Sequence, residues 1–286
     1  MTPAGVGADL VIQAPHVLRE YLEILRLMTG AQGIEPLDRA QCDAYRLHEP
    51  EAIAGVAEAC TAAAYDFALV PHARTLARVR LVALDMDSTL ITIECIDEIA
   101  ELHGIRDEIA AITAAAMRGE IDFRESLTHR VSLLRGLPID ALARVYDERL
   151  KLSPGAERLF AALRDLGAKT LLVSGGFTFF TDRLRVRLAI DHVLANVLDV
   201  EFGGLTGRIA GDIVDAQAKA TRFAELAARY RGTDGLTVAI GDGANDLPML
   251  AQADVSVAFH AKPIVRAQAT HAIDHCGLDA VLNLFA

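Results

Sequence analysis

The pattern of apolar and polar positions changes near residue 80. Beyond it, short and largely apolar runs alternate with segments of helical spacing, and each run stops at a polar residue or a glycine. The runs are residues 81–84, 169–173, 236–240 and 255–259. Such runs are typical of buried strands in a parallel sheet. We therefore predict an α/β fold with a Rossmann-like parallel sheet, whose functional side chains gather at the carboxyl ends of the strands.

The segment between the first and second of these strands has helical spacing throughout. A crossover between parallel strands needs only about a dozen residues, so the pattern predicts a helical cap inserted at about residues 91–152. Asp122 and Glu125 have the spacing of a capping box at the start of one cap helix. After the cap, Ser153 followed by Pro154 predicts the start of the next helix.

The N-terminal part of the chain predicts a separate, smaller domain. Its expected strands and helices follow the order βαββαβ, at residues 9–13, 16–28, 33–36, 42–48, 50–64 and 65–70. This is the order of the ferredoxin-like plait. We therefore expect two domains, residues 1–76 and 77–286.

Composition narrows the classes of function. The formal net charge of −11 argues against nucleic-acid binding, which needs clustered basic residues. The four cysteines are scattered without a C-x-x-C pair, as expected for reduced thiols. The sequence shows neither a signal-peptide pattern nor a run of roughly 18 apolar residues. We expect a cytoplasmic protein without nucleic-acid or membrane partners.

Asp85 and Asp87 follow the first strand of the predicted parallel sheet. Carboxylates at positions i and i+2 of an extended segment point the same way. Their mutual repulsion is relieved when one is protonated or a cation lies between them. One carboxylate could then attack phosphorus and the other transfer a proton. A solvated acidic turn is the alternative.

A glycine-rich segment, residues 241–246, follows the third strand and carries Asp242 and Asp246. It differs from a dinucleotide-binding loop because an aspartate replaces the last glycine, and its charge would face a pyrophosphate. Carboxylates near phosphate suit Mg²⁺, which takes oxygen ligands. A structural turn is the alternative.

Two further signals concern phosphate. Ser174 and Gly175 follow the second strand, where a hydroxyl and backbone N–H groups could hold phosphate oxygens. Lys219 lies near the first turn of a helix with Asp215 as its expected N-cap, where the helix dipole disfavours a cation unless an anion binds. The alternatives are a structural turn and a solvated lysine.

The predicted cap contains charged residues in apolar surroundings. Arg130 shares a helix face with Phe123 and Leu127, and Glu94 is flanked by apolar residues. Burial of an unpaired charge is costly, so each should face an opposite charge. A substrate could supply these charges, and internal ion pairs could do so equally well.

Taken together, these segments resemble the motif set of the haloacid dehalogenase phosphatases. The resemblance is closest to the phosphoserine phosphatases in that group, because it includes the sequences around Glu94, Met117 and Phe123. It covers roughly residues 80–286. It implies magnesium-dependent hydrolysis of O-phosphoserine to serine and phosphate through an aspartyl-phosphate, the last step of serine biosynthesis.

The resemblance also implies roles for single residues. Asp85 would be the nucleophile and a metal ligand. Asp87 would be the general acid and base, and its carbonyl would bind the metal. Asp242 would be a further metal ligand, and Asp246 would support the metal site. The substrate-binding group would comprise Glu94, Met117, Phe123, Arg130, Ser174, Gly175, Lys219 and Asn245. Glu94 would meet the amino group and Arg130 the carboxylate, while Met117 and Phe123 close the cap.

Residues 1–76 resemble an ACT-like domain, for which we expect a regulatory or dimerising role, with a homodimer as one outcome. The glycine-bearing loop that such domains have after their first strand is replaced here by residues 14–16. For the whole chain, a phosphotransferase from phosphoserine to homoserine or a broader phosphomonoesterase remains the alternative. An amino-acid sensor without activity would require a missing motif, and none is missing.

Overall fold

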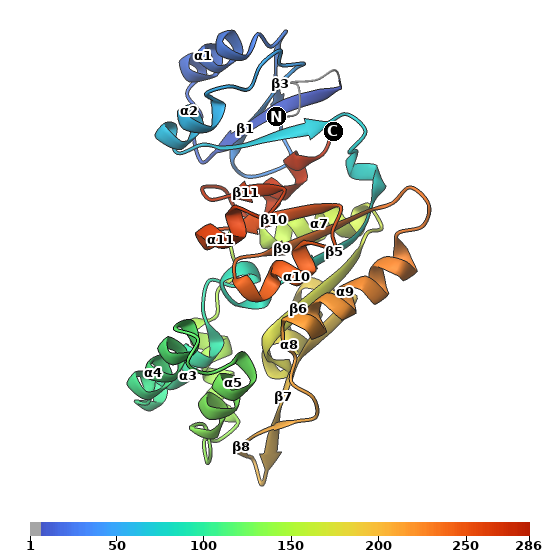
Figure 1. Cartoon of the computed structure of the whole chain (residues 1–286). Helices are drawn as coiled ribbons and strands as arrows, with labels where there is room; N and C mark the ends of the chain where they lie inside the picture. Colours follow the sequence, from blue (N-terminus) through green and yellow to red (C-terminus); the bar gives the residue numbers. More distant parts are fainter. Residues whose placement is uncertain (1–6) are drawn as a thin grey trace.

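The structure, a computed structural model, describes residues 7–286. Residues 1–6 of the predicted first domain lie outside the described residues. The molecule contains two sheets, one of four strands and one of seven. They lie at different levels of the molecule, with the N-terminal sheet above the larger one in Figure 1. The predicted α/β class, with a small additional α+β unit, is confirmed.

The N-terminal unit has the predicted βαββαβ order. Its elements are β1 (Ala8–Ala14), α1 (Arg19–Thr29), β2 (Ile34–Leu37), β3 (Asp43–Leu47), α2 (Val56–Ala63) and β4 (Asp66–Pro71). The sheet is antiparallel in the order β2-β3-β1-β4. Leu10 and Ile12 of β1 pack under the helices, whereas Val11 belongs to the larger core cluster. Successive side chains of a strand point to opposite faces, so β1 is buried on both.

The seven-stranded sheet has the order β11-β10-β9-β5-β6-β7-β8. Its strands are β5 (Val79–Leu84), β6 (Lys169–Phe177), β7 (His192–Glu201), β8 (Gly204–Ala210), β9 (Leu236–Gly241), β10 (Val255–Phe259) and β11 (His271–Ile273). Neighbouring strands are parallel except β7 and β8, which form an antiparallel hairpin. The central position of β5, with β9 and β6 beside it, brings three predicted functional segments to one edge.

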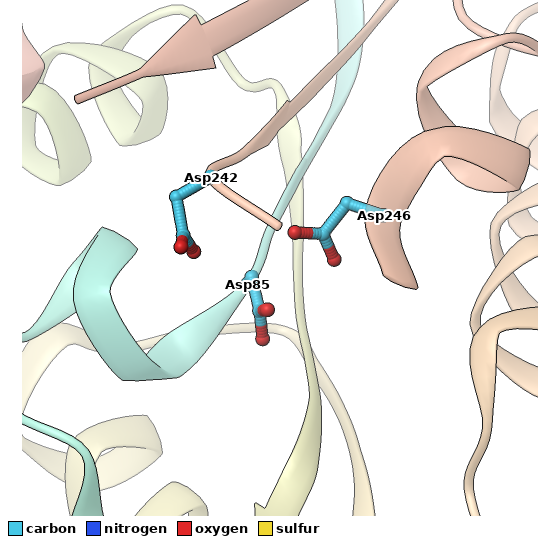
Figure 2. A group of neighbouring side chains, drawn as sticks. All are labelled: Asp85, Asp242 and Asp246. Carbon is cyan, nitrogen blue, oxygen red and sulfur yellow. The ribbon is translucent and has the colours of Figure 1, made fainter. Parts of the chain in front are cut away.

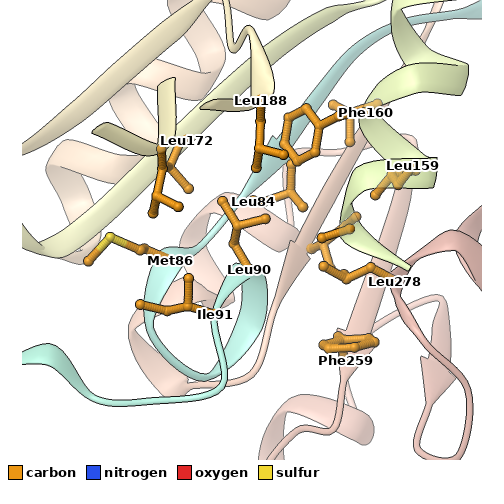
Figure 3. Close-up of a cluster of buried hydrophobic side chains, with 14 of the residues drawn as sticks. Leu84, Met86, Leu90, Ile91, Leu159, Phe160, Leu172, Leu188, Phe259 and Leu278 are labelled. Atoms are coloured by element: carbon orange, nitrogen blue, oxygen red, sulfur yellow. The ribbon is translucent and has the colours of Figure 1, made fainter. Parts of the chain in front are cut away.

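Helices cover both faces of this sheet. They are α7 (Ala156–Asp165), α8 (Thr178–Leu188), α9 (Ala216–Tyr230), α10 (Leu247–Leu250) and α11 (Pro263–Arg266), and short helical turns span η1 (Leu76–Arg78), η2 (Met86–Leu90), η4 (Ala244–Asp246) and η5 (Leu278–Leu284). Phe160 of α7 belongs to the same cluster as Leu84 and Leu172, part of which Figure 3 shows. Phe223 of α9 packs with Leu81 on the opposite face.

A helical cap is inserted between β5 and β6, as predicted. It contains α3 (Cys95–His103), α4 (Arg106–Met117), α5 (Phe123–Ser132), α6 (Asp140–Arg144) and the turn η3 (Val145–Arg149). An isolated bridge between Ile91 and Leu152 closes the insertion at its two ends. Asp122 accepts a hydrogen bond from the Glu125 N–H over 2.8 Å, which confirms the predicted cap of α5.

The predicted N-cap at Ser153 is wrong. Helix α7 begins at Ala156, and its N-cap is Gly155, whose φ is 79°. The hydroxyl of Ser153 instead donates to the carbonyl of Thr89 over 2.6 Å. The hydrogen-bond partner of a serine hydroxyl depends on which groups the fold brings near it. The sequence alone therefore could not distinguish a helix cap from a bond to a distant carbonyl.

The N-terminal unit and the larger unit share a polar contact. The carboxylate of Asp66 in β4 accepts hydrogen bonds from the N–H groups of Asp274, His275 and Cys276, at 2.7–3.1 Å. Arg46 of β3 donates to the carbonyl of Phe285 over 2.8 Å. Each of these bonds joins the two units through backbone groups of the C-terminal segment, so it fixes their relative position.

Candidate active site

Asp85 lies directly after β5, at the carboxyl edge of the sheet. Its N–H donates to the carbonyl of Ile240 in β9, and its Oδ1 accepts from the N–H of Met86 over 2.7 Å. The side chain is buried. Ser88, three residues later, has a φ of 56°, and this left-handed residue turns the chain toward the cap.

Asp87 lies in the same turn but is held differently. Its Oδ1 accepts from the N–H of Cys95 at the start of α3, over 3.3 Å. Burial, together with the nearby charges of Glu94 and Asp85, raises the pKa of Asp87 well above its usual range. A carboxyl group in this state keeps its proton until a reaction removes it, which is what a general acid requires.

Lys219 connects two of the acids. Its ammonium group lies 2.8 Å from Asp85 Oδ2 and 2.9 Å from Asp246 Oδ1, and its side chain is 1% exposed. Burial opposes the charge, but the two carboxylates outweigh burial and raise the pKa of Lys219. The solvated lysine that the sequence left open is therefore excluded. Asp215 accepts from the Ala218 N–H and caps α9, as predicted.

Three carboxylates form a candidate site for a divalent cation. Asp85, Asp242 and Asp246 each offer an oxygen, and these oxygens lie within 4.8 Å of one another. Figure 2 shows the three side chains converging from the ends of β5 and β9 and from η4. Burial and then the charge of Asp85 raise the pKa values of Asp242 and Asp246, the latter to about 7. A bound hard cation would relieve the part of these shifts that comes from repulsion by Asp85, and the three carboxylates are oxygen ligands of the kind such an ion takes, so the residues fit it.

The carboxylate of Asp87 is not part of this cluster among the described residues. It faces the Cys95 N–H instead. The sequence resemblance implied the backbone carbonyl of Asp87, and not its carboxylate, as the group that would bind a metal. Asp242 Oδ1 also accepts from the hydroxyl of Thr89 over 3.0 Å, a partner that the sequence did not indicate.

The segment after β6 provides polar groups beside Asp85. Ser174 is buried, and its Oγ accepts from the N–H of Gly176 over 2.8 Å. Neither Gly175 nor Gly176 could carry a side chain without a shift of its neighbours. A Cβ on Gly176 would lie 2.9 Å from Met86, and one on Gly175 would lie 3.1 Å from the ring of Phe123. Glycine therefore lets the backbone approach the cavity closely.

The cap contributes the opposite wall. Glu94 accepts from the hydroxyl of Ser88 over 2.8 Å, and burial raises its pKa. Arg130 projects from α5, and its Nε is buried and has no hydrogen-bond partner in the part of the chain that the structure describes. Burial lowers the pKa of Arg130, and the charges of Asp97 and Glu94 oppose this shift. An unpaired guanidinium nitrogen of this kind needs an anion.

One cavity of about 190 Å³ joins these groups. It is lined by residues from the strand ends and the cap, namely Asp85, Asp87, Glu94, Ile96, Phe123, Leu127, Arg130, Ser174, Gly175, Gly176, Phe177, Asp242, Gly243, Asn245 and Lys262. Asn245 also approaches Asp85, with Nδ2 3.4 Å from Oδ2. Lys219 and Asp246 are not in this lining but contact it, Lys219 at Asp85 and Asp246 at the N–H of Gly243.

Met117 is the one predicted site residue that the structure does not bring to the others. It is the last residue of α4, its side chain is 76% exposed, and it is absent from the cavity lining. Leu127 and Lys262 line the cavity although neither was among the predicted site residues. Leu127 lies on the apolar helix face that the sequence indicated, but nothing in the sequence distinguished it from a core leucine.

Within residues 7–286, no helix is both long enough and apolar enough to cross a membrane.

Known proteins resemble the chain in sequence and in structure. The family model of haloacid dehalogenase-like hydrolases matches residues 82–251. The phosphoserine phosphatase of Polaromonas sp. is 53% identical over 210 residues, which cover 72% of this chain and 89% of the relative. The unliganded structure of a probable phosphoserine phosphatase from Vibrio cholerae has a TM-score of 0.83 at 38% identity, covering 97% of this chain and 86% of the other.

A substrate-bound phosphoserine phosphatase structure has a TM-score of 0.66 at 36% identity, covering 73% of this chain and 99% of the other. The family match includes the strand ends that carry Asp85, Ser174 and Asp242, so sequence, fold and site agree. The chain therefore belongs to the haloacid dehalogenase-like hydrolases, in the branch that contains these phosphoserine phosphatases.

Proposed function

We propose that the protein hydrolyses O-phospho-L-serine to L-serine and phosphate. The observation that carries the proposal is the buried Nε of Arg130, which has no hydrogen-bond partner among the described residues and belongs to a side chain that lines the same cavity as Asp85. Glu94 lines it as well. A phosphorylated amino acid matches this cavity, since its carboxylate suits the guanidinium and its ammonium group suits Glu94. The relatives named phosphoserine phosphatase support the same substrate.

The chain's own residues suggest the order of events. Asp85 attacks phosphorus, and an aspartyl-phosphate forms as the bond to the serine oxygen breaks. Asp87 gives its proton to that oxygen, and L-serine leaves. Asp87, now ionised, takes a proton from a water molecule that hydrolyses the aspartyl-phosphate, which returns both carboxyl groups to their starting states. The raised pKa of Asp87 supports this role.

Several groups would stabilise the charge on the transferred phosphoryl group. Ser174, the Gly175 N–H, Lys219 and Asn245 are the proposed contacts. We propose magnesium as the cation, held by Asp85, Asp242 and the main-chain carbonyl of Asp87 with Asp246 in support. When bound, it would neutralise charge on the phosphoryl oxygens. Phe123 would cover the substrate from the cap, as would Met117 if α4 moves inward from its exposed position.

Phosphate release from O-phospho-L-serine tests the proposal. Magnesium should support release, and excess chelator should stop it. A panel of other phosphate esters tests for a broader phosphomonoesterase, and added homoserine tests for transfer to an alcohol. Absence of release from phosphoserine under all these conditions, with release from another ester, would reject the substrate but retain the reaction.

For the N-terminal unit, residues 1–76, we propose a packing or dimerising role as an ACT-like domain. Its bonds to the C-terminal segment support packing. Ile24 and Leu27 of α1 are exposed apolar side chains, which supports a contact with a second copy. A sedimentation measurement of the native mass tests the homodimer. We also propose a reducing, cytoplasmic location, supported by four free thiols in the described residues.

A further inference from the structure

The pairing of β6 with β7 breaks beside the proposed phosphoryl site. Val173 is opposite Leu194, but the next pair is Phe177 opposite Asn196. Three residues of β6, Ser174 to Gly176, therefore face a single residue of β7. Peptide groups in such a bulge lose their partners in the ladder. A buried carbonyl left without a donor is costly, so the bulge needs an additional hydrogen-bond partner.

The side chain of Asn196 supplies that partner. It is 1% exposed, and its Nδ2 donates to the carbonyl of Gly175 over 2.8 Å. Its Oδ1 accepts from the N–H of Val214 over 2.8 Å. Because one bond uses the donor and the other the acceptor, the orientation of the amide is fixed.

The first of these bonds controls the hydroxyl of Ser174. The peptide group between Gly175 and Gly176 is held at both ends, by Asn196 at its carbonyl and by Ser174 Oγ at its N–H. Since Oγ accepts from that N–H, the hydroxyl proton of Ser174 is free to be donated. Ser174 lines the cavity, so this proton is available to a phosphoryl oxygen.

The bond from the Val214 N–H to Asn196 connects this side chain with the segment just before α9, the helix that carries Lys219. Val214 precedes Asp215, which caps α9 through the Ala218 N–H. Lys219 lies one turn further and contacts Asp85. A single buried amide thus connects the bulge after β6 with the start of α9, while it does not itself line the cavity.

We propose that Asn196 is a positioning residue for phosphoryl transfer, acting through Ser174 and Gly175 on one side and through α9 on the other. This inference rests on the proposed phosphatase reaction. It concerns the phosphoryl end of the substrate, which every phosphate ester shares, and not the amino-acid end.

Asn196→Asp is the sharpest test. The new side chain has nearly the same shape and still accepts from the Val214 N–H, but its ionised form cannot donate to the Gly175 carbonyl. In metal sites, loss of a hydrogen bond that orients a ligand residue lowers affinity or activity by about 10- to 100-fold, and we take the same range for a bond that orients phosphate-binding groups. We expect kcat/KM to fall by this factor on O-phosphoserine and equally on an aryl phosphate, measured at saturating magnesium.

The pH profile separates positioning from a general loss of structure. A buried carboxyl group has a raised pKa, and its protonated form can donate to Gly175 as the amide does. The ratio of variant to wild-type kcat/KM should therefore rise as the pH falls. Asn196→Ala removes both bonds, so it should lose activity on both esters without this recovery. If the first variant does not fold, the alanine variant still gives the comparison between the two esters.

Asn283→Asp is the matched control. Asn283 is also buried and donates to Gln13 over 2.9 Å, far from the cavity in sequence and in contacts. This variant should lower the melting temperature and leave kcat/KM unchanged. Wild-type kcat/KM in the folded Asn196 variants, a loss confined to phosphoserine, or a loss of equal size in Asn283→Asp would each overturn the inference. If the wild type cleaves only aryl phosphates, the proposed substrate fails while this test still applies.

Discussion

The ammonium group of Lys219 lies 2.8 Å from the carboxylate of Asp85, and both side chains are buried. The same ammonium group lies 2.9 Å from Asp246. One cation therefore balances two acids in a region that also contains Asp242. Removal of one partner from a buried ion pair leaves an uncompensated charge, which is strongly destabilising.

We expect Lys219→Met to lower the free energy of unfolding of the metal-free protein by about 3–5 kcal/mol, the range for breaking a buried pair. Saturating magnesium should restore part of it, because the cation compensates the same carboxylates. Urea denaturation with chelator and with magnesium measures both effects. Lys169→Met is the control, since that lysine pairs with Asp191 at the surface and should contribute roughly 1 kcal/mol or less. Equal losses in the two variants would contradict the account.

Asp85→Asn should abolish steady phosphate release, because an amide oxygen is a poor nucleophile. The protein should remain folded, because Lys219 keeps its ion pair with Asp246 and the change also removes a charge that raises the pKa values of Asp242 and Asp246. Release is measured with O-phosphoserine, and folding is checked by circular dichroism. Asp212→Asn, at an exposed position, should keep wild-type activity. Multiple turnovers by the Asp85 variant would remove this residue from the nucleophile's role.

The sequence indicated those site residues whose position follows from a strand end. Asp85, Ser174 and Asp242 could be placed because parallel strands finish at a common edge, and their separation in the chain does not matter. Asn196 could not be found in this way. Its use depends on a break in strand register, which arises from the pairing of two distant segments and has no local signature.

The depth of burial was also hidden in the sequence. Lys219 has the pattern of an exposed helix residue, yet the fold places it between two acids. Met117 shows the opposite case, since its apolar side chain is exposed at the end of α4. Both depend on how the cap and α9 pack, which single-residue preferences do not specify.

Arg130→Ala should affect phosphoserine far more than an aryl phosphate, because only the former has a carboxylate for the guanidinium. Truncation of one member of a buried charge pair costs about 2–5 kcal/mol, which corresponds to roughly 30- to 5,000-fold in kcat/KM. Steady-state kinetics on the two esters gives the ratio. Arg118→Ala is the control, because that cap arginine is exposed and pairs with Glu120. Equal losses on both esters would show that Arg130 acts on structure and not on recognition.

The acidic cluster should make the metal-free protein less stable as the pH rises. Burial and the charge of Asp85 raise the pKa of Asp246 to about 7, from 3.8. Between the two pKa values the folded state binds more protons than the unfolded state. The stability that protonated Asp246 contributes is therefore fully present below pH 3.8 and is lost as the pH rises to about 7. Asp246→Asn cannot ionise, and its slope should be shallower by up to about 1.4 kcal/mol per pH unit. Urea midpoints in chelator from pH 4.5 to 7.5 measure this, with Asp212→Asn expected to keep the wild-type slope. Identical slopes in all three proteins would show that Asp246 is ionised throughout this range.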